Sequence, residues 1–132
     1  MHSINYLAVV TAAASTFLIG GLWYSPALFE SAWKKANGFT EGEPRAGNQA
    51  VTFGLAFVFS LVMAFDLAMF LNAPDTTAAW GATAGLLSAV WVILGIGTVA
   101  LFERRPFAYT AINGGYWLVT FVVMGAILGA WR

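Results

Sequence analysis

The chain has 132 residues, of which 60% are hydrophobic and only 9% are charged, and its formal net charge is zero. Six basic and six acidic side chains cannot give a soluble domain of this size a polar exterior, so most of the surface should face lipid. Zero net charge gives no general case for nucleic acid as a partner. The chain has no cysteine and a single histidine, His2, so we expect no metal site and no cofactor.

Four long apolar stretches organise the chain. Each is long enough to cross a hydrocarbon layer about 30 Å thick as an α-helix. The connections that precede the third and fourth stretches are short, which predicts antiparallel neighbours. The sequence therefore predicts an all-α fold, an integral membrane four-helix bundle in one domain over residues 1–132, with spans at approximately 6–25, 50–71, 78–102 and 107–131.

The first connection contains a short amphipathic segment. Proline disfavours the helical conformation in the residue before it, so Ser25-Pro26 should end the first span and start a new helix that Ser25 caps. Over residues 26–37 the apolar side chains share one side, and Gly38 is suited to end the helix. We predict an interfacial helix at 26–37 whose candidate lipid contacts are Phe29, Trp33, Lys34 and Lys35.

Basic residues near the span ends predict the orientation. The first and third connections hold Lys34, Lys35, Arg45, Arg104 and Arg105, whereas the face with both termini and the second connection holds Arg132 alone among lysines and arginines. Because cytoplasmic loops carry the excess of basic residues, the first and third connections should be cytoplasmic and both termini outside.

Small residues recur at four-residue spacing on three spans. They are Ala12, Thr16 and Gly20 on the first, Gly81 and Gly85 on the third, and Gly125 and Gly129 on the fourth. Such faces allow close helix packing in lipid. One bundle should have difficulty using all of them internally, so we predict that some join copies into a homo-oligomer.

Polar side chains within the spans form the candidate intramembrane site: Asp66, Asn113, Tyr116 and Thr120. Asp66 is an ionisable group inside a span, which suggests proton or cation handling, although it lies near the outer end and could instead pair structurally. Tyr109, Asn113, Tyr116 and Thr120 share one stripe of the fourth span. The stripe either makes hydrogen bonds between helices or lines a cleft or conduction path.

Most tryptophans fall near predicted span ends, as aromatic residues that prefer the membrane interface should. Trp91 and Trp117 lie deeper in the third and fourth spans. We expect these two rings either to pack between helices or to line a site.

Two motifs carry a family resemblance. Gly21-Leu22-Trp23-Tyr24-Ser25-Pro26-x-Leu28-Phe29 ends the first span, and Phe102-Glu103-Arg104-Arg105-Pro106 precedes Ile112-Asn113-Gly114-Gly115-Tyr116. With them the chain resembles small bacterial four-helix membrane proteins catalogued as a domain of unknown function. The resemblance implies four spans in the bacterial inner membrane and no particular activity. Its motif positions are Trp23, Tyr24, Ser25, Pro26, Glu103, Arg105, Asn113 and Tyr116, while Glu30 stands where the family pattern usually has glycine.

Three functions fit these features. We expect a structural membrane module that binds lipids or a partner protein. The alternative is a small oligomeric channel or transporter that uses Asp66 and the stripe through Asn113 and Tyr116. A third hypothesis is a glutathione-type membrane enzyme, whose cofactor arginines are only loosely matched by Arg104 and Arg105. A polar cavity containing Asp66 would favour the second hypothesis.

Overall fold

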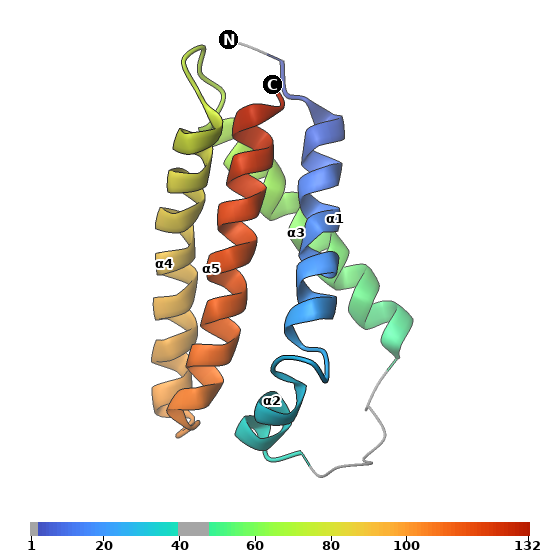
Figure 1. The fold of residues 1–132 in the computed structure, drawn as a ribbon, viewed down its shortest axis with the longest axis vertical. Coiled ribbons are helices and arrows are strands. Elements are labelled where there is room, and N and C mark those ends of the chain that lie inside the picture. Colours follow the sequence, from blue (N-terminus) through green and yellow to red (C-terminus); the bar gives the residue numbers. More distant parts are fainter. Residues whose placement is uncertain (1–2, 40–47) are drawn as a thin grey trace.

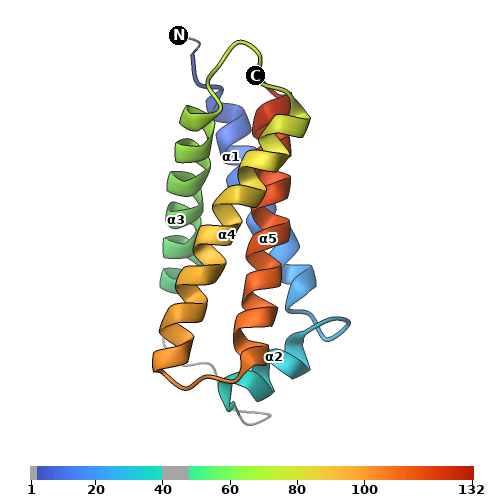
Figure 2. The ribbon, with the colours of Figure 1, turned by 90° about the vertical axis from the view of Figure 1, so that its left-hand side faces the viewer.

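The computed structural model describes residues 3–39 and 48–132. Its helices are α1 (Tyr6–Trp23), α2 (Glu30–Asn37), α3 (Gln49–Phe70), α4 (Ala78–Phe102) and α5 (Phe107–Ala130), and no strand occurs in the described ranges. The four long helices form an up-and-down bundle (Figure 1, Figure 2). We call its two ends the α2 end, which also carries the α4–α5 turn, and the terminal end. The predicted all-α fold with four helices able to span a membrane is confirmed.

Local sequence signals define most helix ends. Asn5, Asn48 and Thr77 each accept a hydrogen bond from a backbone N–H in the first turn of α1, α3 and α4, at 3.1, 2.9 and 3.1 Å respectively. Pro106 stands directly before α5 with a φ of −64°. Gly38 ends α2 with a φ of 73°, a conformation that glycine adopts without strain.

The start of α2 differs from the prediction. The helix begins at Glu30 rather than at Pro26, and its N-cap residue Phe29 makes no capping bond through its side chain. The Ser25 hydroxyl instead donates to a carbonyl of the last turn of α1 at 2.6 Å. The prediction that Ser25 caps this helix is therefore wrong. The reason is tertiary, because the Phe29 ring packs on Trp23 with centroids 4.7 Å apart and holds the intervening residues as turns.

Glycines bring α4 and α5 into backbone contact. A Cβ added to Gly81 would overlap the carbonyl oxygen of Gly125, and the reverse also holds. A Cβ on Gly85 would overlap the carbonyl oxygen of Phe121. This packing, the most extensive between any two helices in the described chain, uses two of the three predicted small-residue faces within one hairpin.

The third small-residue face lies inside the bundle as well. Ala12 and Thr16 of α1 are buried, and a Cβ on Gly20 would lie 3.3 Å from the Tyr116 ring of α5. The expectation that one bundle would have difficulty using all three faces internally is therefore wrong. Two serve the α4–α5 hairpin and one serves the packing of α1, so these faces no longer argue for a homo-oligomer.

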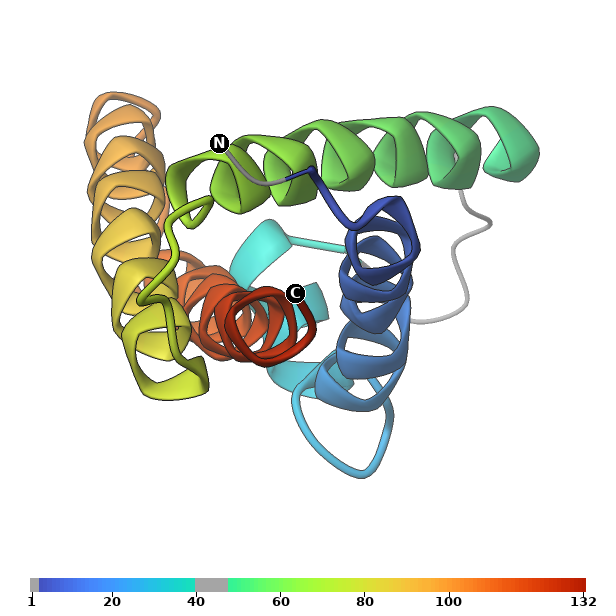
Figure 3. The ribbon, with the colours of Figure 1, turned by 90° about the horizontal axis from the view of Figure 1, so that it is seen from above.

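The outward faces of α3 and α4 are apolar and exposed. Phe59 is 62% exposed, Leu94 63% and Trp91 82%, so the expectation that the Trp91 ring packs between helices or lines a site is wrong. Trp117 is partly buried and packs against the core of the bundle, and its ring lies 5.6 Å from that of Phe121 on the same helix. α3 inclines away from α4 and hardly touches it (Figure 1, Figure 3). Lipid, not water, suits surfaces of this kind.

Candidate functional site

The polar stripe of α5 faces α1. The Tyr24 hydroxyl donates to Asn113 Oδ1 at 2.6 Å, and Asn113 Nδ2 donates to the Tyr109 carbonyl at 2.9 Å. Tyr24 lies just beyond the end of α1. Burial raises the pKa of its hydroxyl above the ordinary value of 10.0, and the neighbouring Tyr116 and Tyr109 hydroxyls raise that pKa by smaller amounts. The Tyr24 hydroxyl therefore remains a donor at neutral pH, and it fixes the Asn113 amide.

A second polar contact joins three helices deeper in the bundle. The Tyr116 hydroxyl of α5 donates to the Thr16 carbonyl of α1 at 2.9 Å. The Thr16 hydroxyl lies 3.2 Å from the Ser60 hydroxyl of α3 and donates to the Ala13 carbonyl at 2.7 Å. Thr16 and Ser60 are both buried, so these bonds connect α1, α3 and α5 away from lipid.

Trp23 anchors the α2 end. Its indole N–H donates to the Ile112 carbonyl at 2.9 Å. Its ring covers Gly115, where an added Cβ would lie 2.6 Å from Trp23 Cζ2, and it also packs on Phe29. A side chain at position 115 would therefore displace the Trp23 indole from this part of α5.

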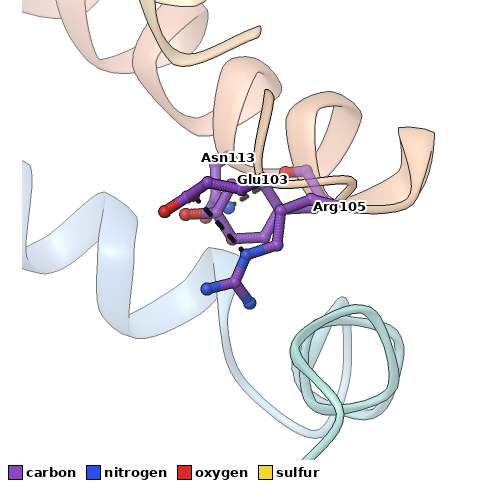
Figure 4. A network of polar contacts seen from close by, with 4 residues as sticks. Glu103, Arg105 and Asn113 are labelled. Carbon is purple, nitrogen blue, oxygen red and sulfur yellow. Dashed lines mark hydrogen bonds and ion pairs between the residues drawn. The ribbon is translucent and has the colours of Figure 1, made fainter. Parts of the chain in front are cut away.

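Glu103 and Arg105 lie on the turn between α4 and α5, and Tyr109 connects them to Asn113 through its ring and its carbonyl group (Figure 4). Arg105 Nε is 3.7 Å from Glu103 Oε1, and the guanidinium carbon is 5.2 Å from the centre of the Tyr109 ring. The Glu103 and Arg105 side chains are 52% and 37% exposed, so this ion pair contributes little to stability and serves mainly to orient Arg105.

Thr120 occupies a different environment from the rest of the stripe. Its side chain is fully buried, and its hydroxyl lies near the Tyr116 hydroxyl but meets no partner in the described chain at hydrogen-bonding geometry. A hydroxyl lining a passage would be accessible, so the stripe ends in packed protein at this level.

Asp66 does not join the other candidate residues. It is exposed one turn before the end of α3, whereas the adjacent Leu67 is 6% exposed and faces the bundle. No hydrogen bond or ion pair links Asp66 to another residue within 3–39 or 48–132. The structure thus brings together Asn113 and Tyr116 with Tyr24 and Thr16, and leaves Asp66 on a different helix and face.

Two hollows lie at the ends of the bundle. A pocket of about 440 Å³ at the terminal end is lined by residues that include Asn5, Leu71, Thr76 and Arg132. A groove of about 300 Å³ at the α2 end is lined by Gly95, Ile96, Val99, Ala100, Glu103 and Tyr109. Neither contains Asp66, Asn113 or Tyr116. In the described part of the chain, no three histidine, cysteine, aspartate or glutamate side chains gather where they could hold a metal ion.

The predicted lipid contacts of α2 divide into two groups. Phe29 packs on Trp23, and Trp33 packs on Tyr24 with ring centroids 5.8 Å apart, so both rings are partly used inside the protein. Lys34 pairs with Glu30 at 2.9 Å, while Lys35 is exposed. Direct contact of α2 with the membrane surface stays a prediction.

Removing the Tyr24 hydroxyl should destabilise the α1–α5 contact. Tyr24→Phe leaves Asn113 Oδ1 without its donor, and we expect the free energy of unfolding in mild detergent to fall by about 1 kcal/mol. Tyr6→Phe is the matched control, because Tyr6 is 64% exposed and its hydroxyl makes no hydrogen bond to a described residue. Equal losses in the two variants would contradict a specific role for the Tyr24 bond.

Sequence reasoning missed the Thr16 and Ser60 pair. In the sequence Thr16 stands out only as a small residue, and Ser60 carries no pattern of its own. The available signal was a hydroxyl in the middle of an apolar span, since a polar side chain there normally faces another helix. Which two hydroxyls meet depends on the crossing of α1 and α3, and a single helix face does not show that.

Four spanning helices, apolar outward faces and polar side chains bonded between helices define a multi-span helical membrane protein. The family described as "Protein of unknown function (DUF1761)" matches residues 7–129, and the chain belongs to that family. The predicted membership of a family of unknown function is thereby confirmed, whereas the roles of the motif positions stay predictions. No curated protein and no solved structure matches the chain.

Proposed function

We propose that this protein is a structural membrane module that binds lipids or a partner protein in the bacterial inner membrane. The observation that supports it most is the use of the α5 stripe. The side-chain polar groups of Asn113 and Tyr116 form hydrogen bonds of 2.6 to 2.9 Å, to α1 or its end and to their own helix. Groups held in this way connect helices and are poorly suited to exchange ligands along a path.

The surfaces that remain for interaction are of two kinds. The outward faces of α3 and α4 are apolar and fit acyl chains. The α2 end carries cations, of which Lys35 and Arg104 have no partner in the described part of the chain and fit anionic headgroups. Should the protein form a homo-oligomer, the faces of α3 and α4 are the surfaces through which copies would meet.

The proposed orientation places the α2 end in the cytoplasm and both termini outside. It rests on the concentration of lysines and arginines at that end, in the first and third connections. Arg45, which contributes to this argument, lies outside the described residues.

Site-specific labelling tests the orientation directly. The chain has no cysteine, so a single cysteine can be introduced as Ser3→Cys or Lys35→Cys without background. With a membrane-impermeant maleimide, we expect Ser3→Cys to be labelled in intact spheroplasts and Lys35→Cys to be labelled only after the spheroplasts are permeabilised. The opposite pattern would overturn the orientation.

A measurement of ion flux distinguishes the proposed structural module from the alternative, a channel or transporter. Proteoliposomes with a proton or potassium gradient should leak no faster than empty liposomes, and Asp66→Asn should leave this unchanged. Flux above background that Asp66→Asn abolishes would overturn the proposed function in favour of the transporter alternative.

A further inference from the structure

The turn after α4 contains a residue in a backbone conformation that its side chain disfavours. Arg104 has a φ of 58°, in the left-handed region that side chains other than glycine rarely adopt. The N–H of Arg104 donates to Leu101 O at 3.2 Å, and that of Arg105 donates to Ala100 O at 2.9 Å. α2 ends with the same pattern around Gly38. The chain thus has glycine at one of two equivalent positions and arginine at the other.

The Arg104 side chain has no bonded partner within the described chain. It is exposed and makes no hydrogen bond or ion pair with a residue in the ranges 3–39 and 48–132. Arg105, in contrast, is held by Glu103 and the Tyr109 ring. Because Arg105 offsets the Glu103 carboxylate, the charge of Arg104 has no carboxylate partner in the described ranges. The chain keeps arginine at position 104 although its backbone conformation disfavours any residue but glycine. Such strain often marks a functional site, and an unpaired guanidinium there suggests that it binds an anion outside the protein.

An apolar groove begins at the same turn. It has a volume of about 300 Å³ and is lined by α4 residues, with Glu103 and Tyr109 at the turn side. A Cβ added to Gly95 would meet no atom within 4 Å, so this glycine leaves open space. Phe102 and Phe107, which flank the turn, are 86% and 84% exposed. An apolar groove that reaches the turn at Glu103, on a turn that also carries a free cation and is flanked by exposed aromatic residues, matches the boundary between headgroups and acyl chains.

We infer that the α4–α5 turn binds one anionic glycerophospholipid, with its phosphate at Arg104 and an acyl chain in the groove beside Gly95. The guanidinium fits phosphate through paired hydrogen bonds. The single positive charge of Arg104 matches a headgroup with one negative charge, such as phosphatidylglycerol, and a headgroup hydroxyl would donate to the Glu103 carboxylate. This inference rests on the proposed lipid-binding function and specifies its lipid class and site.

Replacing Arg104 tests the headgroup contact. Full-length protein in detergent is delipidated and titrated with phosphatidylglycerol or phosphatidylcholine, and bound lipid is counted by native mass spectrometry. Wild type should retain phosphatidylglycerol in preference, and Arg104→Gly should bind it about five-fold more weakly. The thermal midpoint of Arg104→Gly should equal or exceed that of wild type, because glycine accepts a φ of 58°. Arg132→Gly, at the terminal end, is the matched control and should bind as wild type does.

Filling the groove tests the acyl contact. Gly95→Leu should weaken phosphatidylglycerol binding without lowering the thermal midpoint, since the new side chain enters open space in a helix. The inference is overturned if Arg104→Gly binds phosphatidylglycerol as wild type does, if it loses lipid and thermal stability together, or if inorganic phosphate displaces the lipid. These outcomes leave the labelling and flux results untouched, so the inference can fail while the proposed function stands.

Discussion

Gly125→Ala should separate α4 from α5 and lower the free energy of unfolding by about 3 kcal/mol or more. The new methyl group would overlap the Gly81 carbonyl oxygen, which belongs to a helix backbone and cannot rotate away. The helices must move apart, and the close packing along their whole contact weakens with them. Unfolding in a mixed-micelle titration measures the loss, and cysteine cross-linking between the two helices reports the separation.

Gly54→Ala is the matched control for this substitution. Gly54 lies within α3, and an added Cβ there meets no atom within 4 Å. Because alanine favours helix more than glycine does, the control should be neutral or more stable by up to about 1 kcal/mol. Similar losses in the two variants would show that the α4–α5 contact does not depend on glycine.

Trp23→Ala should lower the free energy of unfolding by about 3 kcal/mol, the lower end of the range for removing a buried tryptophan, because Trp23 is only half-buried. The variant loses the indole bond to the Ile112 carbonyl and the cover over Gly115. Trp23→Phe separates these effects, since it keeps most of the ring and removes the bond, and it should cost about 1 kcal/mol.

Trp91→Ala provides the comparison, because the Trp91 ring is 82% exposed on the outward face of α4. In micelles that hold a single copy, we expect its effect to stay below about 0.5 kcal/mol. A large loss for Trp91→Ala together with a small one for Trp23→Ala would contradict the described packing of α1 on α5.

The helices could be predicted because their signals are local. An apolar stretch of sufficient length forms a helix in lipid whatever its neighbours do, since each backbone group must be bonded within the segment. Gly38 also acts locally, through its own φ. Ser25 and Pro26 failed as the start of α2 because contact between Phe29 and Trp23 outweighs the capping preference.

The candidate site could be predicted only by residue type. The spacing of Asn113 and Tyr116 placed them on one face, and that face does meet another helix. Their partners, Tyr24 and Thr16, are far away in the sequence and depend on how α1 crosses α5. Asp66 looked similar to them by composition, yet the rotation of α3 turns it outward. Helix rotation is set by packing between helices, which a single sequence does not display.

The long sequence separation of the α1–α5 bonds has a consequence for biogenesis. The Tyr24–Asn113 and Tyr116–Thr16 bonds join residues 89 and 100 positions apart, so they form only after the last helix has entered the membrane. The α4–α5 hairpin also needs the last helix, but its contacts are local in sequence, so it can assemble before α5 packs on α1. A polypeptide arrested before α5 would keep the Trp23 and Tyr24 donors unpaired. Such an incomplete chain would differ from the finished protein in having polar groups without partners at the end of α1.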